Sequence, residues 1–192
     1  MTLLILGLVL FLGVHSVRIV ADDFRSAQIR RLGENGWKAL YSVASIAGFA
    51  LIVWGYGVAR QQPSALWTTP VQVLHAGTLL MLVSFVLLAA AYVPGNGIKA
   101  RLHHPMVLSV KVWALAHLLA NNSLADVLLF GSFLVWAVFS FRAARARDRA
   151  ANTIGAAGAL SRTLATVAVG TTAWAAFAFW AHAALIGVSP FA

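Results

Sequence analysis

Histidines are the residues of this chain that are best suited to chemistry. The sequence has 192 residues, with six histidines, no cysteine and only five acidic residues. Without cysteine, the chain cannot form disulfides, Cys-ligated zinc, iron–sulfur clusters or a thiolate-bound haem. His117 lies in an apolar run, where an imidazole is costly unless it faces protein, water or a ligand. A metal or cofactor site in this protein would therefore depend on histidine.

The spacing of the histidines limits which kinds of metal or cofactor site they could form. No two of them are three or four residues apart, the spacing that puts two ligands on one face of a helix. His104 and His117 are separated by about 220° around a common helix. This pattern disfavours a mononuclear catalytic zinc site and a di-iron site. It fits a haem held between helices, each of which donates one axial histidine.

Structural roles for the histidines compete with ligand roles. His15, close to Arg18, could extend to the membrane interface, and His104 beside Pro105 could cap a helix. His117 could form a buried hydrogen bond between helices. The other three are expected at the membrane interfaces or in the aromatic belt: His75, His103 and His182.

Two further residues of the same segment are candidates for cofactor contacts. Lys111 follows His104 by seven residues, so both lie on one face of a helix. Its ammonium lies within an apolar span and needs a carboxylate, a haem propionate or an anionic lipid headgroup. Trp113 precedes His117 by four residues and shares its face. The other tryptophans are expected in aromatic belts and in helix packing.

The elements that position these residues are membrane-spanning helices. Apolar residues make up 61% of the chain, charged residues only 10%, and the mean hydropathy is +0.85. Apolar runs of about 20 residues are long enough to cross a hydrocarbon core about 30 Å thick. We predict an all-α, polytopic transmembrane bundle that forms one domain over residues 1–192. Its six expected spans are residues 2–20, 38–59, 71–92, 104–120, 124–141 and 161–188.

The connections between the spans predict the orientation. Spans four and five are expected to form a tight hairpin, because only residues 121–123 join them. All basic residues except Arg60 and Lys111 lie in the first, third and fifth connections or at the span ends beside them. The positive-inside rule makes these connections cytoplasmic and puts both termini outside, in the periplasm of a bacterial cell. The net charge of +9 therefore indicates contact with membrane lipids and not with nucleic acid.

Several segments together resemble the NnrU family, over nearly the whole chain. They are residues 7–18, 36–42, 54–57, 104–122 and 185–191. The family takes its name from genes that accompany nitrite and nitric oxide reductase clusters in denitrifying bacteria. It is similar to the 15-cis-zeta-carotene isomerase, a haem b enzyme with histidine ligands. By position, the resemblance implies haem b with His15 and His117 as candidate axial ligands, and His104 as a further site residue.

The expected depths of the histidines in the membrane leave open which two of them bind the haem. Counted from the inner ends of their spans, His15 and His117 differ in depth by about 12 Å in an untilted bundle. Two axial ligands of one haem lie only about 4 Å apart. His15 with His104 fits better on depth, so it stays the alternative pair.

Three functions are compatible with these residues and with the resemblance. The first is a haem b membrane protein that supports nitrite and nitric oxide reduction, or related redox chemistry with a redox partner. The second is a haem-dependent cis–trans isomerase of a carotenoid-like apolar polyene. The third is a non-haem assembly factor or lipid-binding scaffold with structural histidines. Enzyme status and oligomeric state stay open at this level.

Overall fold

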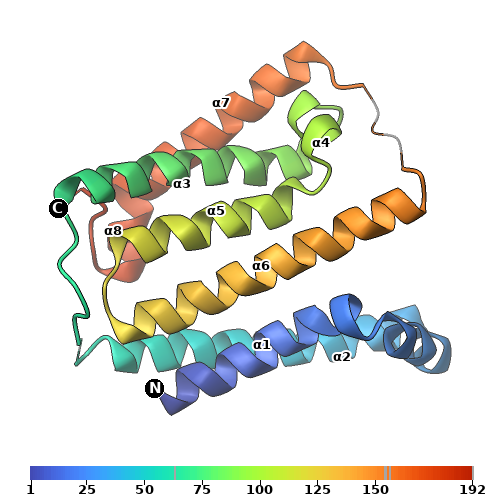
Figure 1. Cartoon of the computed structure of the whole chain (residues 1–192), viewed down its shortest axis with the longest axis horizontal. Coiled ribbons are helices and arrows are strands. Elements are labelled where there is room, and N and C mark those ends of the chain that lie inside the picture. The colour runs from blue at the N-terminus through green and yellow to red at the C-terminus, as the bar shows by residue number, and fades with distance from the viewer. Residues whose placement is uncertain (63, 154, 156, 192) are drawn as a thin grey trace. The chain divides into compact units, whose positions relative to one another are not determined.

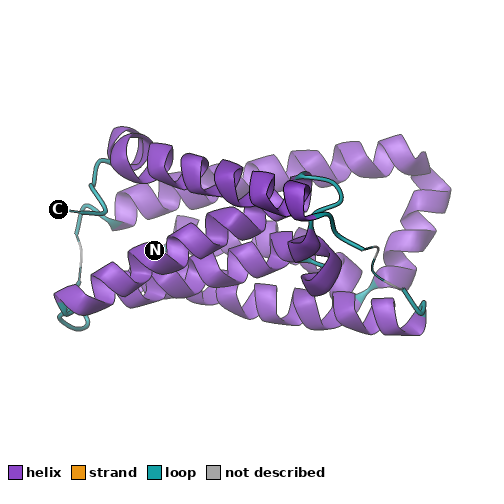
Figure 2. Cartoon of the chain, turned by 90° about the horizontal axis from the view of Figure 1, so that it is seen from above, coloured by secondary structure: helices purple, strands orange, loops and turns teal. Residues whose placement is uncertain are grey.

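A computed structural model of the chain describes all residues except 63, 154, 156 and 192. Within this described part the elements are helices joined by short connections, and no β-strand is formed (Figure 2). The elements in chain order are α1 (Thr2–Val20), α2 (Asp22–Ala59), α3 (Val71–Tyr92), α4 (Gly97–Leu102), α5 (Pro105–Ala120), α6 (Leu124–Ala150), α7 (Leu160–Ala176), the π-helical turn η1 (Phe177–Ala181) and α8 (His182–Ile186) (Figure 1).

The prediction of a helical membrane bundle is confirmed. Among the described residues, five helical segments are long and apolar enough to cross a membrane: α1, α2, α3, α6 and the continuous stretch Leu160–Ile186. The fourth expected span, α5, has 16 residues. At 1.5 Å per residue it measures about 24 Å, which is less than the hydrocarbon thickness. The three-residue connection between α5 and α6 is as predicted.

The boundaries of two predicted spans were wrong, because helix continues into polar sequence. The second span begins at Asp22 and not at Lys38, and it is interrupted at Gly33, whose φ is 73° and ψ is 165°. Asp22 and Asp23 in the first turn favour this polar helix, and Arg25 pairs with Asp22 at 3.5 Å. Helix α6 continues nine residues past Phe141, through the Arg-rich fifth connection.

The last span also differs from its predicted limits, at both ends. It begins at Leu160 and ends at Ile186, where Gly187 takes the left-handed conformation with φ of 78°. A helix that ends on such a glycine needs no side chain to stop it.

The chain divides into two compact units, which are described separately. The first comprises Met1–Thr68 and Asn121–Ser140, and the second Thr69–Ala120 and Phe141–Ala192. Helix α6 contributes residues to both units. That residues 1–192 form one domain therefore stays a prediction.

In the first unit, α1 and α2 pack closely through glycines. A Cβ atom on Gly7 would lie 2.6 Å from the Ile52 nitrogen, and one on Gly48 would lie 2.8 Å from the Phe11 nitrogen. A Cβ atom on Gly55 would meet the backbone of Leu4. Figure 1 shows the two helices side by side. Small residues allow such close approach where no hydrophobic effect drives helices together in lipid.

In the second unit, α3 is the central helix and contacts both α5 and α7. The buried Ser84 hydroxyl donates to the Ser109 carbonyl of α5 at 2.8 Å. On the side of α7, a Cβ atom on Gly170 would lie 2.6 Å from Val86 Cα. The fully buried Asn96 accepts from the Lys99 nitrogen at 2.7 Å and so caps α4.

We expect the glycine contacts to determine the stability of the first unit. Gly55→Ala should lower the free energy of unfolding by about 1–3 kcal/mol, because the added methyl group meets backbone atoms that cannot move independently. Gly57→Ala is the matched control, since nothing lies within 4 Å of its Cβ position. It should leave stability unchanged or raise it by up to about 1 kcal/mol. Thermal unfolding in detergent, followed by circular dichroism, measures both; equal melting temperatures would contradict the packing.

Candidate functional site

His15 lies on α1, and a hydrogen bond within that helix indicates which of its two ring nitrogens carries the proton. Its Nδ1 atom lies 2.7 Å from the carbonyl oxygen of Phe11, one turn earlier. A carbonyl oxygen only accepts, so Nδ1 carries the proton and donates. In the neutral ring Nε2 then carries the lone pair. This is the arrangement of a metal-binding histidine whose second nitrogen is held by a backbone carbonyl.

Aromatic side chains surround the half-buried His15 ring. Phe11 stacks on it with ring centroids 4.1 Å apart, and Tyr41 of α2 lies at 5.1 Å. Trp136 of α6 meets it edge-on at 6.1 Å. The indole nitrogen of Trp136 is buried and has no hydrogen-bond partner in the described part of the chain. The imidazole is therefore held in an apolar, aromatic setting within the first unit.

His117, in the second unit, repeats the local arrangement of His15. Its Nδ1 atom donates to the Trp113 carbonyl at 2.9 Å, again one turn earlier. The Trp113 ring lies 5.2 Å from the imidazole. Both predicted ligands thus follow an aromatic residue by four positions and have the same protonated nitrogen. Lys111, on the same helix, is half-buried, and no described residue forms a hydrogen bond or ion pair with it.

His103 and His104 converge on a single carboxylate of the second unit. His104 Nε2 lies 2.9 Å and His103 Nδ1 3.4 Å from Asp148 Oδ2. Arg145 Nη1 reaches the same oxygen at 3.3 Å. His103 makes this possible through a strained turn: its φ is 68°, and the His104 amide donates to the Leu102 carbonyl at 2.9 Å.

The Asp148 carboxylate lies beyond the membrane-spanning part of α6. Burial raises its pKa, but the hydrogen bond from His104 lowers it. The neighbouring His103 and Arg145 act in the same direction as His104, so the pKa lies below its usual value. The carboxylate is therefore charged at neutral pH and accepts from His104 Nε2. In a neutral ring that leaves the lone pair of His104 on Nδ1, which is the opposite tautomer to His15 and His117.

The remaining histidines show no such convergence. His182 is half-buried and donates from Nδ1 to the Val188 carbonyl at 2.6 Å, whereas His75 is exposed. Across the described part of the chain, no three histidine, aspartate or glutamate side chains group as a metal site by themselves.

A buried acid at the start of α6 was not predicted from the sequence. Asp126 is 7% exposed; its Oδ1 atom accepts from the Tyr56 hydroxyl of α2, and its Oδ2 atom accepts from the Ser123 amide at 2.9 Å. The Ser123 hydroxyl in turn accepts from the Asp126 amide at 3.2 Å. This is a capping box, and the pattern Ser-x-x-Asp before an apolar run could have revealed it.

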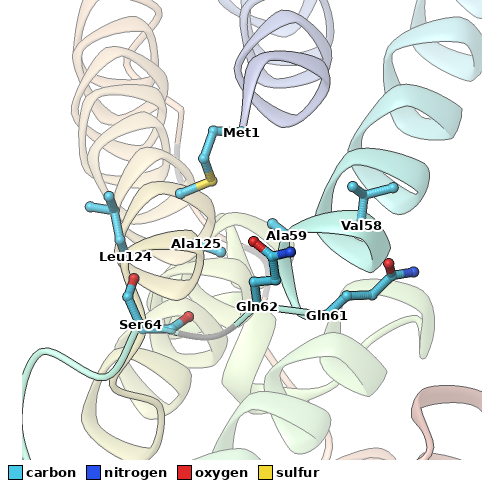
Figure 3. Close-up of a pocket in the computed structure, with 9 residues that line it drawn as sticks. Met1, Val58, Ala59, Gln61, Gln62, Ser64, Leu124 and Ala125 are labelled. Carbon is cyan, nitrogen blue, oxygen red and sulfur yellow. The ribbon is translucent and has the colours of Figure 1, made fainter.

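Two open cavities lie among the described residues of the first unit. One, of about 350 Å³, lies where α1 and α6 begin and α2 ends, and it is lined by Met1, Gln61, Gln62 and Leu124 among others (Figure 3). It has no histidine or acidic lining residue. The other, of about 650 Å³, lies between α1 and α6 and includes Trp136 in its lining. His15 does not line this second cavity, but Trp136, which does, contacts the His15 ring.

The Tyr56–Asp126 hydrogen bond should stabilise the first unit. Tyr56→Phe should lower the free energy of unfolding by about 1–3 kcal/mol, because a buried carboxylate oxygen loses its donor. Tyr92→Phe is the control, since Tyr92 is 71% exposed, and it should change stability by less than about 0.5 kcal/mol. Denaturant unfolding in detergent compares the two; equal effects would mean that the hydrogen bond contributes nothing.

Comparison with known proteins agrees with the resemblance seen in the sequence. The family model described as NnrU protein matches residues 3–190, which is nearly the whole chain. No curated protein and no solved structure matches the chain. The match includes both helical units and every histidine discussed above. The chain therefore belongs to the NnrU family.

Proposed function

We propose that this NnrU-family protein binds haem b in a bacterial cytoplasmic membrane, with His15 and His117 as axial ligands. The observation that carries the proposal is the tautomer that these two residues share. Each donates from Nδ1 to the carbonyl four residues earlier, at 2.7 and 2.9 Å. Each therefore has its lone pair on Nε2, the nitrogen that is farther from the backbone.

The surroundings of both residues suit a large apolar cofactor. His15 lies among the aromatic rings of Phe11, Tyr41 and Trp136. Trp113 lies against His117, and Lys111 offers an ammonium for an anionic group such as a propionate. A bound haem would supply one-electron redox chemistry. The protein's part would be to fix the ligand nitrogens and to exclude water.

Hydrogen bonding also favours His117 over His104 as the second ligand. His104 Nε2 is hydrogen-bonded to Asp148, and Asp148 also accepts from Arg145. Ligation through Nε2 would require this ion-pair cluster to break. We therefore propose that His104 positions the start of α5 and does not bind iron.

Family membership supports the biological setting of the proposal. The genes after which the family is named accompany nitrite and nitric oxide reductases. We propose that the haem protein supports that reduction in the cytoplasmic membrane, with both termini in the periplasm. The clustering of basic residues in the odd-numbered connections supports this orientation.

Absorption spectra of the detergent-purified protein test the haem. Reconstituted wild type should show a sharp Soret band when oxidised and split visible bands after dithionite reduction. His117→Ala and His15→Ala should each abolish or broaden these bands, because each removes an axial nitrogen. His75→Ala is the control and should leave them intact, since His75 is exposed.

Three outcomes would contradict the proposed ligand pair, the proposed redox role or the presence of haem, respectively. Loss of haem in His104→Ala with retention in His15→Ala would make His104 a ligand instead. Conversion of a cis-polyene by the haem-loaded protein would favour an isomerase. Absence of a Soret band in reconstituted wild type would leave a non-haem scaffold.

Reporter fusions test the orientation. A fusion after residue 150 should give a cytoplasmic signal and one at the C-terminus a periplasmic signal, because the basic fifth connection stays inside. A fusion in the second connection, after Gln62, is the internal control and should report the periplasm. The reverse pattern would show that both termini are cytoplasmic.

A further inference from the structure

A cavity of about 400 Å³ lies between α4 and the start of α7, within the second unit. Figure 1 shows the short helix α4 beside the first turns of α7. The residues that line the cavity include Arg101 and Leu102 of α4 and Leu160 of α7. No histidine lines it, so it is distinct from the surroundings of every residue considered above as a haem ligand.

Backbone contacts form one wall of this cavity. A Cβ atom on Gly158 would meet Gly97 Cα, so two glycines allow the connection before α7 to lie directly against α4. The Thr163 hydroxyl accepts from the Gly97 amide at 2.8 Å and donates to the Ala159 carbonyl at 2.9 Å. The Ala159 amide donates to the Gly95 carbonyl at 2.9 Å. The polar groups of this wall are therefore paired with one another.

Arg101 is the charged residue that lines the cavity. Gly97, Ile98 and Arg101 all line it, and they fall within about 100° of one another around α4, so they share one face. Arg101 is exposed and forms no hydrogen bond or ion pair with any described residue. Lys99 projects about 160° away from Arg101 around the helix, and its ammonium donates to the Ala91 carbonyl at 3.1 Å. Of the two cations of α4, only Arg101 can therefore meet a ligand in the cavity.

The second unit has no free carboxylate to pair with this guanidinium. Asp148 is the only acidic residue in the sequence of this unit. One oxygen of Asp148 already contacts three cationic or imidazole side chains, those of His103, His104 and Arg145. An anion that pairs with Arg101 would therefore have to come from outside this unit.

The remaining lining side chains are apolar, and they lie at the end of a membrane span. Leu160 is 74% and Leu102 41% exposed, although both line the cavity. Leu160 is also the first residue of the stretch Leu160–Ile186, which is long and apolar enough to cross a membrane. The end of a span lies where acyl chains meet the lipid headgroups. An arginine beside exposed leucines at this level complements an anionic lipid, because the guanidinium pairs with phosphate and the leucines contact the acyl chain.

We propose that the cavity between α4 and α7 binds an anionic phospholipid, with the phosphate at Arg101 and the start of one acyl chain against Leu102 and Leu160. In the orientation proposed above, this lipid belongs to the cytoplasmic leaflet. The choice of leaflet rests on that orientation, but the binding site itself does not. The site is also independent of haem, because no histidine lines it. The bound lipid joins α4 to the start of the last span, in addition to the direct bond between Gly97 and Thr163.

Native mass spectrometry of the full-length protein in detergent tests the headgroup. The probes are phosphatidylglycerol and phosphatidylcholine with identical acyl chains. Wild type should retain phosphatidylglycerol about fivefold better, because one arginine near an anionic headgroup favours binding by a factor of this size. Arg101→Gln should remove that preference. Arg162→Gln is the matched control, since it removes the same charge from the start of α7 but does not line the cavity, and it should keep most of the preference.

A change in the apolar lining tests the acyl chain separately. Leu160→Asn should lower retention of both lipids several-fold, because it removes apolar surface that the acyl chain would cover. Leu164→Asn is the matched control: its side chain lies one turn further along α7 and is 60% exposed, but it does not line the cavity. Helicity and melting temperature are measured for all four variants, so a loss of lipid through unfolding is recognised as such.

The outcomes distinguish an anionic lipid in this cavity from other ways of holding lipid. Equal retention of the two lipids by wild type would rule out an anionic ligand. Equal loss of preference in Arg101→Gln and Arg162→Gln would mean that the overall charge of this end acts, and not the cavity. Displacement of phosphatidylglycerol by inorganic phosphate would show a site for a small anion instead. The Soret band is measured in parallel, so failure of the haem proposal is recorded independently.

Discussion

Hydrocarbon cannot accept or donate hydrogen bonds, and this constraint governs every polar side chain in the spans. The nearest acceptor in a helix is the carbonyl four residues earlier, and this chain uses it repeatedly. Hydroxyl groups of Ser45, Thr78 and Thr166 donate to it, at 2.7, 3.1 and 2.8 Å. His15 and His117 use it as well. For a hydroxyl the bond has only a structural effect, whereas for an imidazole it also decides which nitrogen carries the lone pair.

Some polar groups that are not satisfied within their own helix form hydrogen bonds between helices. Asp126 receives the Tyr56 hydroxyl, and Ser84 reaches the Ser109 carbonyl, each within its own unit. These bonds supplement the close backbone contacts at Gly55 and Gly170. Such contacts keep His15 beside α2, as its ring contact with Tyr41 shows. The carbonyl of its own helix thus sets the tautomer of His15, the proposed ligand, and the neighbouring helices fix the position of its ring.

The sequence predicted the spans well because a long apolar run has only one stable form in lipid. It failed at the ends of α2 and α6, where the helix continues through charged residues that carry no apolar periodicity. The aromatic residues four positions before His15 and His117 are visible in the sequence, but the hydrogen bonds to their carbonyls depend on side-chain orientation, which the sequence does not show. The convergence of His103 and His104 on Asp148 could not be predicted, because it needs a strained backbone at His103 and a partner 44 residues away.

The proposed haem ligation requires that His15 and His117 each present Nε2 as the unprotonated nitrogen, which ¹⁵N NMR of the ring nitrogens measures. In haem-free protein labelled at histidine, His15 and His117 should be protonated at Nδ1, and His104 at Nε2. Single histidine variants assign the signals. On addition of ferric haem, only the signals of His15 and His117 should broaden. Protonation of His15 at Nε2, or broadening of the His104 signal in place of either proposed ligand, would show that the proposed ligand pair is wrong.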